Sequence, residues 1–170
     1  MAGTAPDTPL VALLSGPNLE LLGVRQPSMY GTDRLADHVA RAGRAAERCG
    51  ARLSHSSHAS EGDLVLAVTG ARGQAAALVV NAGALTHYGW SLADALAAFD
   101  GPKIELHLSH PEAREPWRHT SVLAPVVDGT VAGLGGLGYE IAVEAACRLL
   151  SERAAGGAGE GAAGERLRDA

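Results

Sequence analysis

The chain has 170 residues and a formal net charge of −5, because 19 Asp and Glu outnumber 14 Lys and Arg. An acidic balance without clustered Lys and Arg argues against a nucleic-acid surface. No apolar run approaches the roughly 20 residues that span a bilayer, and the N-terminus lacks the basic and apolar segments of a secretory signal. The composition therefore predicts a cytoplasmic protein that binds neither nucleic acid nor a membrane.

The two ends of the chain differ in composition from its middle. Residues 1–8 and 153–170 are rich in Gly, Ala and charged side chains, and such segments bury too little apolar surface to offset the entropy of ordering. We expect both to be disordered tails. The remaining residues, 9–152, are enough for one domain around one core. Cys49 and Cys147 are single thiols without a CxxC spacing, which favours small buried apolar groups over a disulfide.

Short apolar runs alternate with alanine-rich stretches throughout the predicted domain. In chain order they predict a strand at 9–15, a helix at 32–49, a strand at 53–57, a helix at 61–72, a strand at 77–81, a helix at 92–99, strands at 103–108 and 131–134, and a helix at 139–151. Thr32 and Ser91 are expected to cap the first and third helices, and Gly50 to close the first. This alternation is typical of an α/β fold with a five-stranded parallel sheet and helices on both faces.

The segment that follows the first strand, residues 15–31, is too long for a plain turn between a strand and a helix. It carries Asn18, Arg25 and Tyr30 beyond the carboxyl end of a strand, where parallel sheets bind ligands. An arginine near the Tyr30 hydroxyl would lower the tyrosine pKa and favour a phenolate, which is a competent general base. The alternative is a surface connection in which the tyrosine has no chemical role.

Glu105 and His107 alternate along the fourth predicted strand, so their side chains leave the same face of the sheet. The carboxylate can set the tautomer and charge of the imidazole, which then acts as a proton donor. The alternative is a satisfied structural pair at the end of the strand. Leu108 and Ser109 follow where backbone N–H groups can open toward an anion. Arg118 is a candidate clamp for a carboxylate or a diol.

Asn81 and His87 bracket a glycine-containing turn after the third strand, and Asp94 lies one turn into the next predicted helix. Each has a structural alternative, since Asn81 can satisfy backbone groups, an isolated His is more often structural, and a carboxylate is stabilised near a helix N-terminus. The chain has no phosphate-binding loop, no nucleophile elbow and no convincing set of metal ligands. Its single lysine, Lys103, opens a strand at the end opposite the loops, which argues against a Schiff base. We therefore expect neither a metal nor a cofactor.

Several segments match one known family in order and with compatible spacing. The segment SGPNLELLGVRQPSMYG resembles the active-site loop of type II 3-dehydroquinate dehydratases, in which a GPNLNLLG-like run precedes R-E-P and Y-G. NAGALTH followed by Asp94, and IELHLSH followed by Arg114 and Arg118, are similar to two further motif blocks of that family. GLGGLGYEIAVEA resembles its closing strand and helix. The resemblance covers about residues 10–150 and implies a flavodoxin-like fold.

The resemblance also implies an activity: a hydro-lyase of the shikimate pathway of aromatic amino acid biosynthesis, which dehydrates 3-dehydroquinate to 3-dehydroshikimate through an enolate, without a cofactor. By matching positions, Tyr30 would be the base that takes the C2 proton, with Arg25 favouring its phenolate. Asn18 would hold a water that stabilises the enolate. His107, supported by Glu105, would protonate the departing C1 hydroxyl. The implied substrate-binding residues are Asn81, His87, Leu108, Ser109 and Arg118, with Leu108 acting through its backbone.

The family forms trimers that assemble into dodecamers, so the resemblance implies a homododecamer in which Asp94 reaches the site of a neighbouring subunit. The chain departs from the family pattern at several positions. Ser15 replaces a common asparagine, Gln26 stands where a glutamate usually follows the loop arginine, and Ala93 stands where an arginine commonly precedes the helix aspartate. These departures leave room for one alternative, a dehydratase of an aminated dehydroquinate analogue in a specialised pathway. An alternative of another class is a catalytically silent flavodoxin-like binding protein, against which the intact set of predicted catalytic residues counts.

Overall fold

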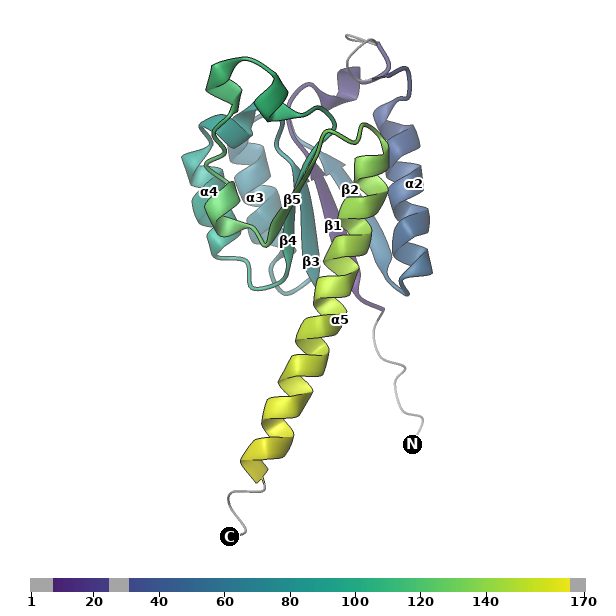
Figure 1. The fold of residues 1–170 in the computed structure, drawn as a ribbon, viewed down its shortest axis with the longest axis vertical. Coiled ribbons are helices and arrows are strands. Elements are labelled where there is room, and N and C mark those ends of the chain that lie inside the picture. Colours follow the sequence, from purple (N-terminus) through teal and green to yellow (C-terminus); the bar gives the residue numbers. More distant parts are fainter. Residues whose placement is uncertain (1–7, 25–30, 166–170) are drawn as a thin grey trace.

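The strands of the chain form one parallel sheet. The computed structural model describes residues 8–24 and 31–165, with side chains through residue 156. Within these residues the sheet consists of β1 (Leu10–Ser15), β2 (Arg52–Ser57), β3 (Ala77–Asn81), β4 (Lys103–His107) and β5 (Gly129–Ala132). Neighbouring strands are parallel, in the order β2-β1-β3-β4-β5 (Figure 1). The predicted α/β class and five-stranded parallel sheet are confirmed, and this strand order is the flavodoxin-like one.

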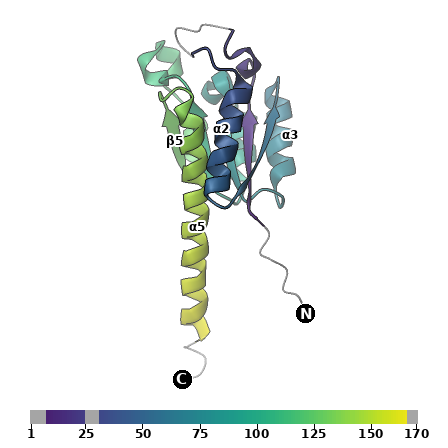
Figure 2. The ribbon, with the colours of Figure 1, turned by 90° about the vertical axis from the view of Figure 1, so that its right-hand side faces the viewer.

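Four α-helices of the described residues cover the two faces of the sheet: α2 (Leu35–Arg48), α3 (Glu61–Ala71), α4 (Trp90–Ala97) and α5 (Leu137–Glu165). Helices α2 and α5 lie side by side on one face, and α3 and α4 lie on the other (Figure 1, Figure 2). Short 3-10 helices occupy the loops: η1 (Leu19–Leu21), η2 (Gly83–His87), η3 (Pro111–Ala113), η4 (Pro116–Arg118) and η5 (Ala124–Val126). No helix in the described part of the chain is both long and apolar enough to cross a membrane.

Successive residues of the central strands point to opposite faces of the sheet and build two cores. On β1, Val11 and Leu13 pack with α2 and α5, whereas Ala12 and Leu14 pack with α3 and α4. Because the strand is buried on both faces, its sequence is a continuous apolar run rather than an alternating one. This is why the apolar run alone is enough to predict β1.

The start of α2 differs from the prediction. The helix begins at Leu35, so Thr32 is not its cap. Instead, the Asp37 carboxylate in the first turn accepts a hydrogen bond from the backbone N–H of Arg34 at 2.9 Å. The predicted end is confirmed, because Gly50 follows the helix with a φ of 70°, in the left-handed region that favours glycine.

The start of α4 also differs from the prediction. The helix begins at Trp90, preceded by Gly89, so Ser91 lies inside it and does not cap it. The acceptor for a first-turn donor comes from a different helix, since the Glu61 carboxylate accepts a hydrogen bond from the backbone N–H of Leu92 at 3.1 Å. Such a long-range cap satisfies the free N–H groups of a helix end without leaving a local sequence signal.

The last strand begins and ends two residues earlier than the predicted 131–134. Pairing with β4 determines its position, because His107 lies opposite Ala132 in the parallel register. Gly133 then turns the chain with a φ of 80°. The bounds of β5 therefore follow from its partner strand and from this glycine.

The last helix, α5, extends to Glu165 and so includes much of the segment 153–170 that was predicted to be a disordered tail (Figure 1). Lengthening an existing helix does not require a new nucleus, so α5 can continue beyond the packed domain even though this segment is rich in glycine, which disfavours a helix. The predicted N-terminal tail, residues 1–8, lies outside the described residues except for its last position.

Helices α2 and α5 meet in a contact between two aromatic rings. The buried His38 ring stacks on the buried Tyr139 ring, with the centroids 5.1 Å apart and the planes at 8°. Arg41 donates a hydrogen bond to His38 Nδ1 at 2.7 Å, whereas His38 Nε2 is buried and has no hydrogen-bond partner among the described residues. A Cβ at Gly136 would lie 2.5 Å from the His38 ring, so this close approach requires glycine.

We expect His38 to make the stability of the fold depend on pH. Burial first, and then the positive charge of Arg41, lower the pKa of His38, while Asp33 and Asp37 oppose this effect. Below about pH 6.5 the imidazole of the unfolded chain binds a proton that the folded chain binds less readily, so the free energy of unfolding falls as the pH falls. His38→Phe keeps the ring stack and removes this titration, so its free energy of unfolding should fall less steeply between about pH 7 and pH 5.

Urea unfolding across this pH range measures the effect. His119→Gln, which removes an exposed imidazole, is the control and should keep the slope of the unsubstituted chain. A residual slope should remain in His38→Phe, because burial also lowers the pKa of His55. Equal slopes for His38→Phe and the unsubstituted chain would show that His38 does not titrate between the two states.

Candidate active site

A cavity opens beyond the carboxyl ends of β1, β3 and β4, at the edge where sheets of this kind bind ligands. Its volume is about 320 Å³. The predicted site residues that line it are Asn18, Asn81, His87, His107, Leu108, Ser109 and Arg118. The structure therefore brings together in space the polar residues that follow three separate strands.

The described part of the chain does not place every residue singled out from the sequence at this cavity. Arg25, Gln26 and Tyr30 lie outside the described residues. Asp94 is exposed on α4 and does not line the cavity. Lys103 lies at the opposite end of β4, where its ammonium group donates a hydrogen bond to the carbonyl of Phe99 at 2.8 Å. Within the described ranges, no three His, Cys, Asp or Glu side chains are grouped closely enough to hold a metal ion.

Asn18 reaches the cavity from an uncommon backbone conformation. Its φ of 68° is the one positive φ of a non-glycine residue among those described, and asparagine tolerates this left-handed region better than most side chains. The Asn18 carbonyl accepts a hydrogen bond from the backbone N–H of Leu21 at 3.1 Å, which starts η1. The turn therefore fixes where the Asn18 side chain leaves the backbone, directly after β1.

Asn81, the last residue of β3, is held by both ends of its amide. The Oδ1 atom accepts a hydrogen bond from the backbone N–H of Gly83 at 3.3 Å, and Nδ2 donates to the Tyr139 hydroxyl at 3.3 Å. Burial raises the pKa of Tyr139 to about 12, although hydrogen bonds with Asn81 and Ser15 partly offset it. Tyr139 therefore stays neutral, and its hydroxyl oxygen can accept from Asn81 and fix the orientation of the amide.

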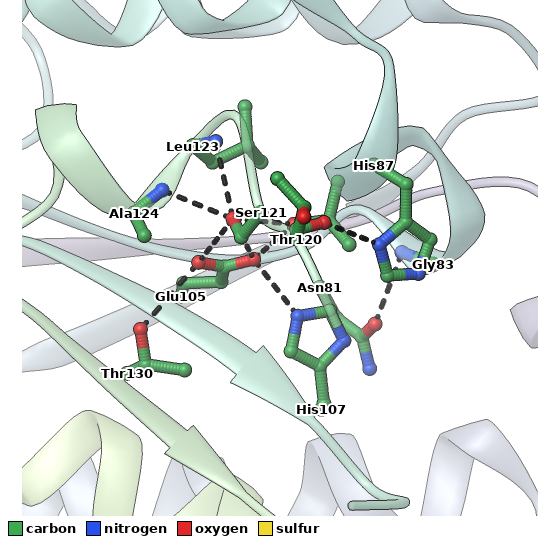
Figure 3. A network of polar contacts seen from close by, with 11 residues as sticks. Asn81, Gly83, His87, Glu105, His107, Thr120, Ser121, Leu123, Ala124 and Thr130 are labelled. Atoms are coloured by element: carbon green, nitrogen blue, oxygen red, sulfur yellow. Dashed lines mark hydrogen bonds and ion pairs between the residues drawn. The ribbon is translucent and has the colours of Figure 1, made fainter. Parts of the chain in front are cut away.

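Glu105 is a carboxylate buried behind the cavity, with 1% of its surface exposed. Its Oε1 atom accepts hydrogen bonds from His107 Nε2 at 2.8 Å and from the Ser121 hydroxyl at 3.0 Å (Figure 3). The same atom accepts a hydrogen bond from the Thr86 hydroxyl. Its Oε2 atom accepts from Ser121 at 3.0 Å, and the Thr130 hydroxyl lies 3.5 Å away. Burial opposes ionisation, but the hydrogen bonds outweigh it and hold the pKa of Glu105 below its ordinary value.

His107 separates Glu105 from the cavity. A carboxylate oxygen only accepts, so the 2.8 Å contact with Glu105 places a proton on His107 Nε2. The Nδ1 atom is then the ring nitrogen left for a ligand in the cavity, which His107 lines. This arrangement suits a proton donor, because the neighbouring anion stabilises the imidazolium before the proton is transferred.

His87 is oriented by the segment that carries the arginines. Its Nδ1 atom donates a hydrogen bond to the backbone carbonyl of Thr120 at 2.8 Å (Figure 3). The edge of its ring contacts Trp117 in a T-shaped arrangement, with centroids 5.2 Å apart. Because Nδ1 carries the proton, His87 Nε2 is an acceptor available to a ligand hydroxyl.

Two arginines, Arg114 and Arg118, line the cavity together with one carboxylate, Glu115, which leaves an excess of positive charge there. The Arg118 guanidinium lies 3.9 Å from the centroid of the Trp117 ring and donates to the Glu115 carboxylate at 2.8 Å. Arg114 donates to the Ser109 hydroxyl at 3.3 Å. Guanidinium groups held in this way are well suited to bind a carboxylate. The cavity therefore combines an anion-binding wall with a proton donor.

Two residues that contact Glu105, Thr86 and Ser121, were missed from the sequence. Isolated hydroxyl residues have no spacing that reveals a chemical role, and each contacts Glu105 only through the tertiary fold. The one available signal is position along the chain. Thr86 directly precedes the predicted ligand-binding residue His87, and Ser121 comes shortly after Arg118.

Comparisons with known proteins identify the family. A family model described as class II dehydroquinase matches residues 9–147. A 3-dehydroquinate dehydratase of Hyphomonas neptunium is 49% identical over 142 residues, which are 84% of this chain and 95% of that protein. A catabolic 3-dehydroquinase of Aspergillus clavatus is 44% identical over 144 residues, which are 85% of this chain and 96% of that protein.

A solved structure agrees with these matches. The crystal structure of the type II dehydroquinase from Propionibacterium acnes matches with a TM-score of 0.79 at 36% identity, covering 83% of this chain and 97% of that one. The resemblance drawn from the sequence motifs is thus confirmed. Because the family match extends over most of the chain and includes every segment that lines the cavity, this chain belongs to the class II dehydroquinase family.

Proposed function

We propose that this chain is a hydro-lyase of the shikimate pathway that dehydrates 3-dehydroquinate to 3-dehydroshikimate. The observation that carries the proposal is the Glu105–His107 pair, joined at 2.8 Å beside a cavity with a wall of arginine side chains. The substrate is a small carboxylate from which a hydroxyl must leave as water. A cavity with an anion-binding wall and a proton donor fits that requirement, and the relatives named 3-dehydroquinate dehydratase share the family.

The first step removes a weakly acidic proton from C2, beside the C3 ketone. Tyr30 is the proposed base, and Arg25 favours its phenolate by electrostatic attraction. The negative charge that develops on the ketone oxygen needs a donor, which Asn18 supplies through a water molecule. These assignments come from the family motif, and for Asn18 they are supported by its place on the cavity wall.

The second step expels the C1 hydroxyl. His107 donates the proton that converts hydroxide into water, from the ring nitrogen that faces away from Glu105. Glu105 stabilises the imidazolium before the transfer. The C1–O bond breaks as the enolate electrons form the C1–C2 double bond, and the product is a conjugated enone.

Substrate binding is assigned to the remaining residues of the cavity wall. Arg118 and the backbone of Leu108 and Ser109 bind the carboxylate, and Asn81 and His87 bind ring hydroxyls. Support comes from the fixed orientation of the Asn81 amide and of the His87 ring. A side chain that is already oriented loses less conformational entropy when it binds a ligand.

The proposed reaction needs neither a cofactor nor a Schiff base. Lys103 is the single lysine of the chain, and it lies at the amino end of β4, whereas the cavity lies at the carboxyl end. Its ammonium group is occupied by the carbonyls of Phe99 and Gly101. An imine between this lysine and a ketone in the cavity is therefore sterically unreasonable.

We also propose an oligomeric state and a cellular location for the chain. The chain forms a cytoplasmic homododecamer of trimers, in which residues 9–152 are the catalytic domain and Asp94 reaches the site of a neighbouring subunit. Leu66, Tyr88 and Trp90 are large apolar side chains with 72%, 57% and 69% of their surface exposed. Exposed apolar groups of this size on α3 and near the start of α4 support a subunit contact beside Asp94. The aminated analogue and the silent binding protein are not favoured by the relatives.

The assay with 3-dehydroquinate tests the proposal directly. Purified full-length chain, in buffer with a chelator, should raise the near-ultraviolet absorbance as the conjugated enone appears. Lys103→Arg is the control for the imine route and should retain its activity within about twofold, because the lysine is remote from the cavity. Absence of product from correctly folded protein would refute the proposed function, and product from an aminated analogue alone would favour that substrate.

The assignment of the base predicts a large effect at Tyr30. Tyr30→Phe removes the ionisable hydroxyl and should lower kcat by about 10²- to 10⁴-fold, the usual contribution of general base catalysis. Arg25→Ala should move the pH at which the base becomes ionised upward, because the phenolate loses its positive neighbour. The pH profile of kcat/KM measures both. A Tyr30→Phe variant with most of its activity would show that another group is the base.

The buried carboxylate predicts a second effect. Glu105→Gln keeps the shape but removes the charge that stabilises the His107 imidazolium, so kcat should fall by about 10²-fold or more. Since hydrogen bonds hold the pKa of Glu105 below its ordinary value, the unsubstituted chain should keep this carboxylate ionised, and its contribution to activity, down to mildly acidic pH. Rate measurements between about pH 4 and pH 8 test this. An unchanged kcat in Glu105→Gln would leave Glu105 with a structural role only.

A further inference from the structure

Thr86 and Ser121 reach the same carboxylate from two different loops. Thr86 lies in η2, after β3, and Ser121 lies after η4, yet their hydroxyl oxygens are 3.0 Å apart and both contact Glu105 Oε1. Thr86 is almost completely buried and Ser121 is half-buried. Neither residue lines the cavity, and neither takes part in a step of the proposed reaction.

The hydrogen bonds of Ser121 determine where its proton points. The backbone N–H groups of Leu123 and Ala124 donate to the Ser121 oxygen at 3.1 and 3.0 Å (Figure 3). A hydroxyl oxygen has two lone pairs and one proton, so these two donors occupy both lone pairs. The proton of Ser121 must therefore be donated, and its acceptor is Glu105, whose two oxygens both lie at 3.0 Å.

The lone pairs of Ser121 also determine where the proton of Thr86 points. Ser121 has no lone pair left to accept the Thr86 proton, so Thr86 also donates to Glu105. Glu105 is then surrounded by donors, and a proton on its carboxyl group would displace one of them. The proton between Glu105 and His107 therefore belongs to His107 Nε2 and not to Glu105.

Thr86 and Ser121 also connect the Glu105–His107 pair to the segment that carries Arg118. The backbone N–H of Val122 donates to the carbonyl of Thr86 at 2.8 Å, and His87 donates to the carbonyl of Thr120 at 2.8 Å. The chain around Ser121 is thus fastened to η2 on one side and to Glu105 on the other. Arg118 belongs to the same segment, so its position relative to His107 depends on these contacts.

We propose that Thr86 and Ser121 are positioning residues for the dehydration, which keep Glu105 ionised, hold the proton of His107 on Nε2 and thereby leave His107 Nδ1 to face the substrate. The inference rests on the proposed function, because it concerns the acid that releases water. It extends that function to two hydroxyl groups that do not touch the substrate.

Four variants separate the effect on the carboxylate from an effect on the loop. Thr86→Val removes a donor to Glu105 and leaves the turn at Ser121 intact. Ser121→Ala removes a donor and also the acceptor for two backbone groups, whereas Ser121→Thr retains the hydroxyl. Thr130→Val is the matched control, because Thr130 is an exposed residue and its hydroxyl lies 3.5 Å from the same carboxylate.

Steady-state rates as a function of pH provide the first measurement. In Thr86→Val and Ser121→Ala, kcat should fall by about 10- to 100-fold, the ratio that corresponds to one hydrogen bond to a charged group. The acidic limb of the kcat profile should move to higher pH, because the carboxylate loses a donor that favours its ionised form. Ser121→Thr should recover most of the rate, and Thr130→Val should change it least.

Nitrogen NMR of the histidine side chains in the unliganded full-length chain provides a second measurement that does not need activity. In its neutral form, His107 should carry its proton on Nε2, and Thr86→Val should lower the share of that tautomer. A wild-type His107 protonated on Nδ1 would overturn the inference. So would a Thr86→Val variant whose kcat profile and tautomer match the unsubstituted chain, even if Ser121→Ala alone raised KM, since that pattern indicates a purely structural turn.

The two failures can be told apart. If the unsubstituted chain does not dehydrate 3-dehydroquinate, the proposed function fails, and the tautomer of His107 still decides whether the two hydroxyls position the pair. If the chain is active and both the pH profile and the tautomer are insensitive to Thr86→Val, the positioning role fails and the proposed function remains.

Discussion

The active site depends on the burial of one carboxylate, Glu105, at the carboxyl edge of a parallel sheet. An unpaired charge in that position would destabilise the fold by several kcal/mol, so the surrounding loops must supply hydrogen-bond donors. The donors are His107 on β4, Thr86 in η2 and Ser121 in the segment after η4. The segments that carry His87 and Arg118 are therefore positioned by the same contacts that make the buried charge tolerable.

The strand order explains why those loops meet. In the order β2-β1-β3-β4-β5, strands β1 and β3 are neighbours although β2 lies between them in sequence. The loops after β1 and β3 diverge to opposite faces at such a point, which leaves a crevice beyond the strand ends. Asn18, after β1, and Asn81, at the end of β3, both line this crevice, and His107 reaches it from β4. The crevice is thus a property of the topology, and the side chains determine what it binds.

Features that depend on residues close together in sequence could be predicted, whereas contacts between residues far apart in sequence could not. The burial of β1 and the common face of Glu105 and His107 follow from local periodicity, so both could be predicted. The cap of α4 could not be predicted, because its acceptor, Glu61, is 31 residues away from its donor. Likewise Ser121 contacts two residues that are distant in sequence, Glu105 at 16 residues and Thr86 at 35 residues from it. Tertiary pairing chooses such partners among many hydroxyl residues, and no local pattern marks them.

A cavity proposed to bind a carboxylate substrate lies next to a buried carboxylate, and the two negative charges would repel each other if both faced the cavity. The structure avoids this repulsion by the direction of the hydrogen bonds. The two oxygens of Glu105 accept hydrogen bonds from Thr86, Ser121 and His107 Nε2, which balance its charge, and of these three donors His107 lines the cavity. Arg114 and Arg118, which precede Ser121 in the chain, line the cavity and bring positive charge to it. Glu105 therefore acts on the substrate mainly through His107, whose Nε2 it holds by a hydrogen bond at 2.8 Å.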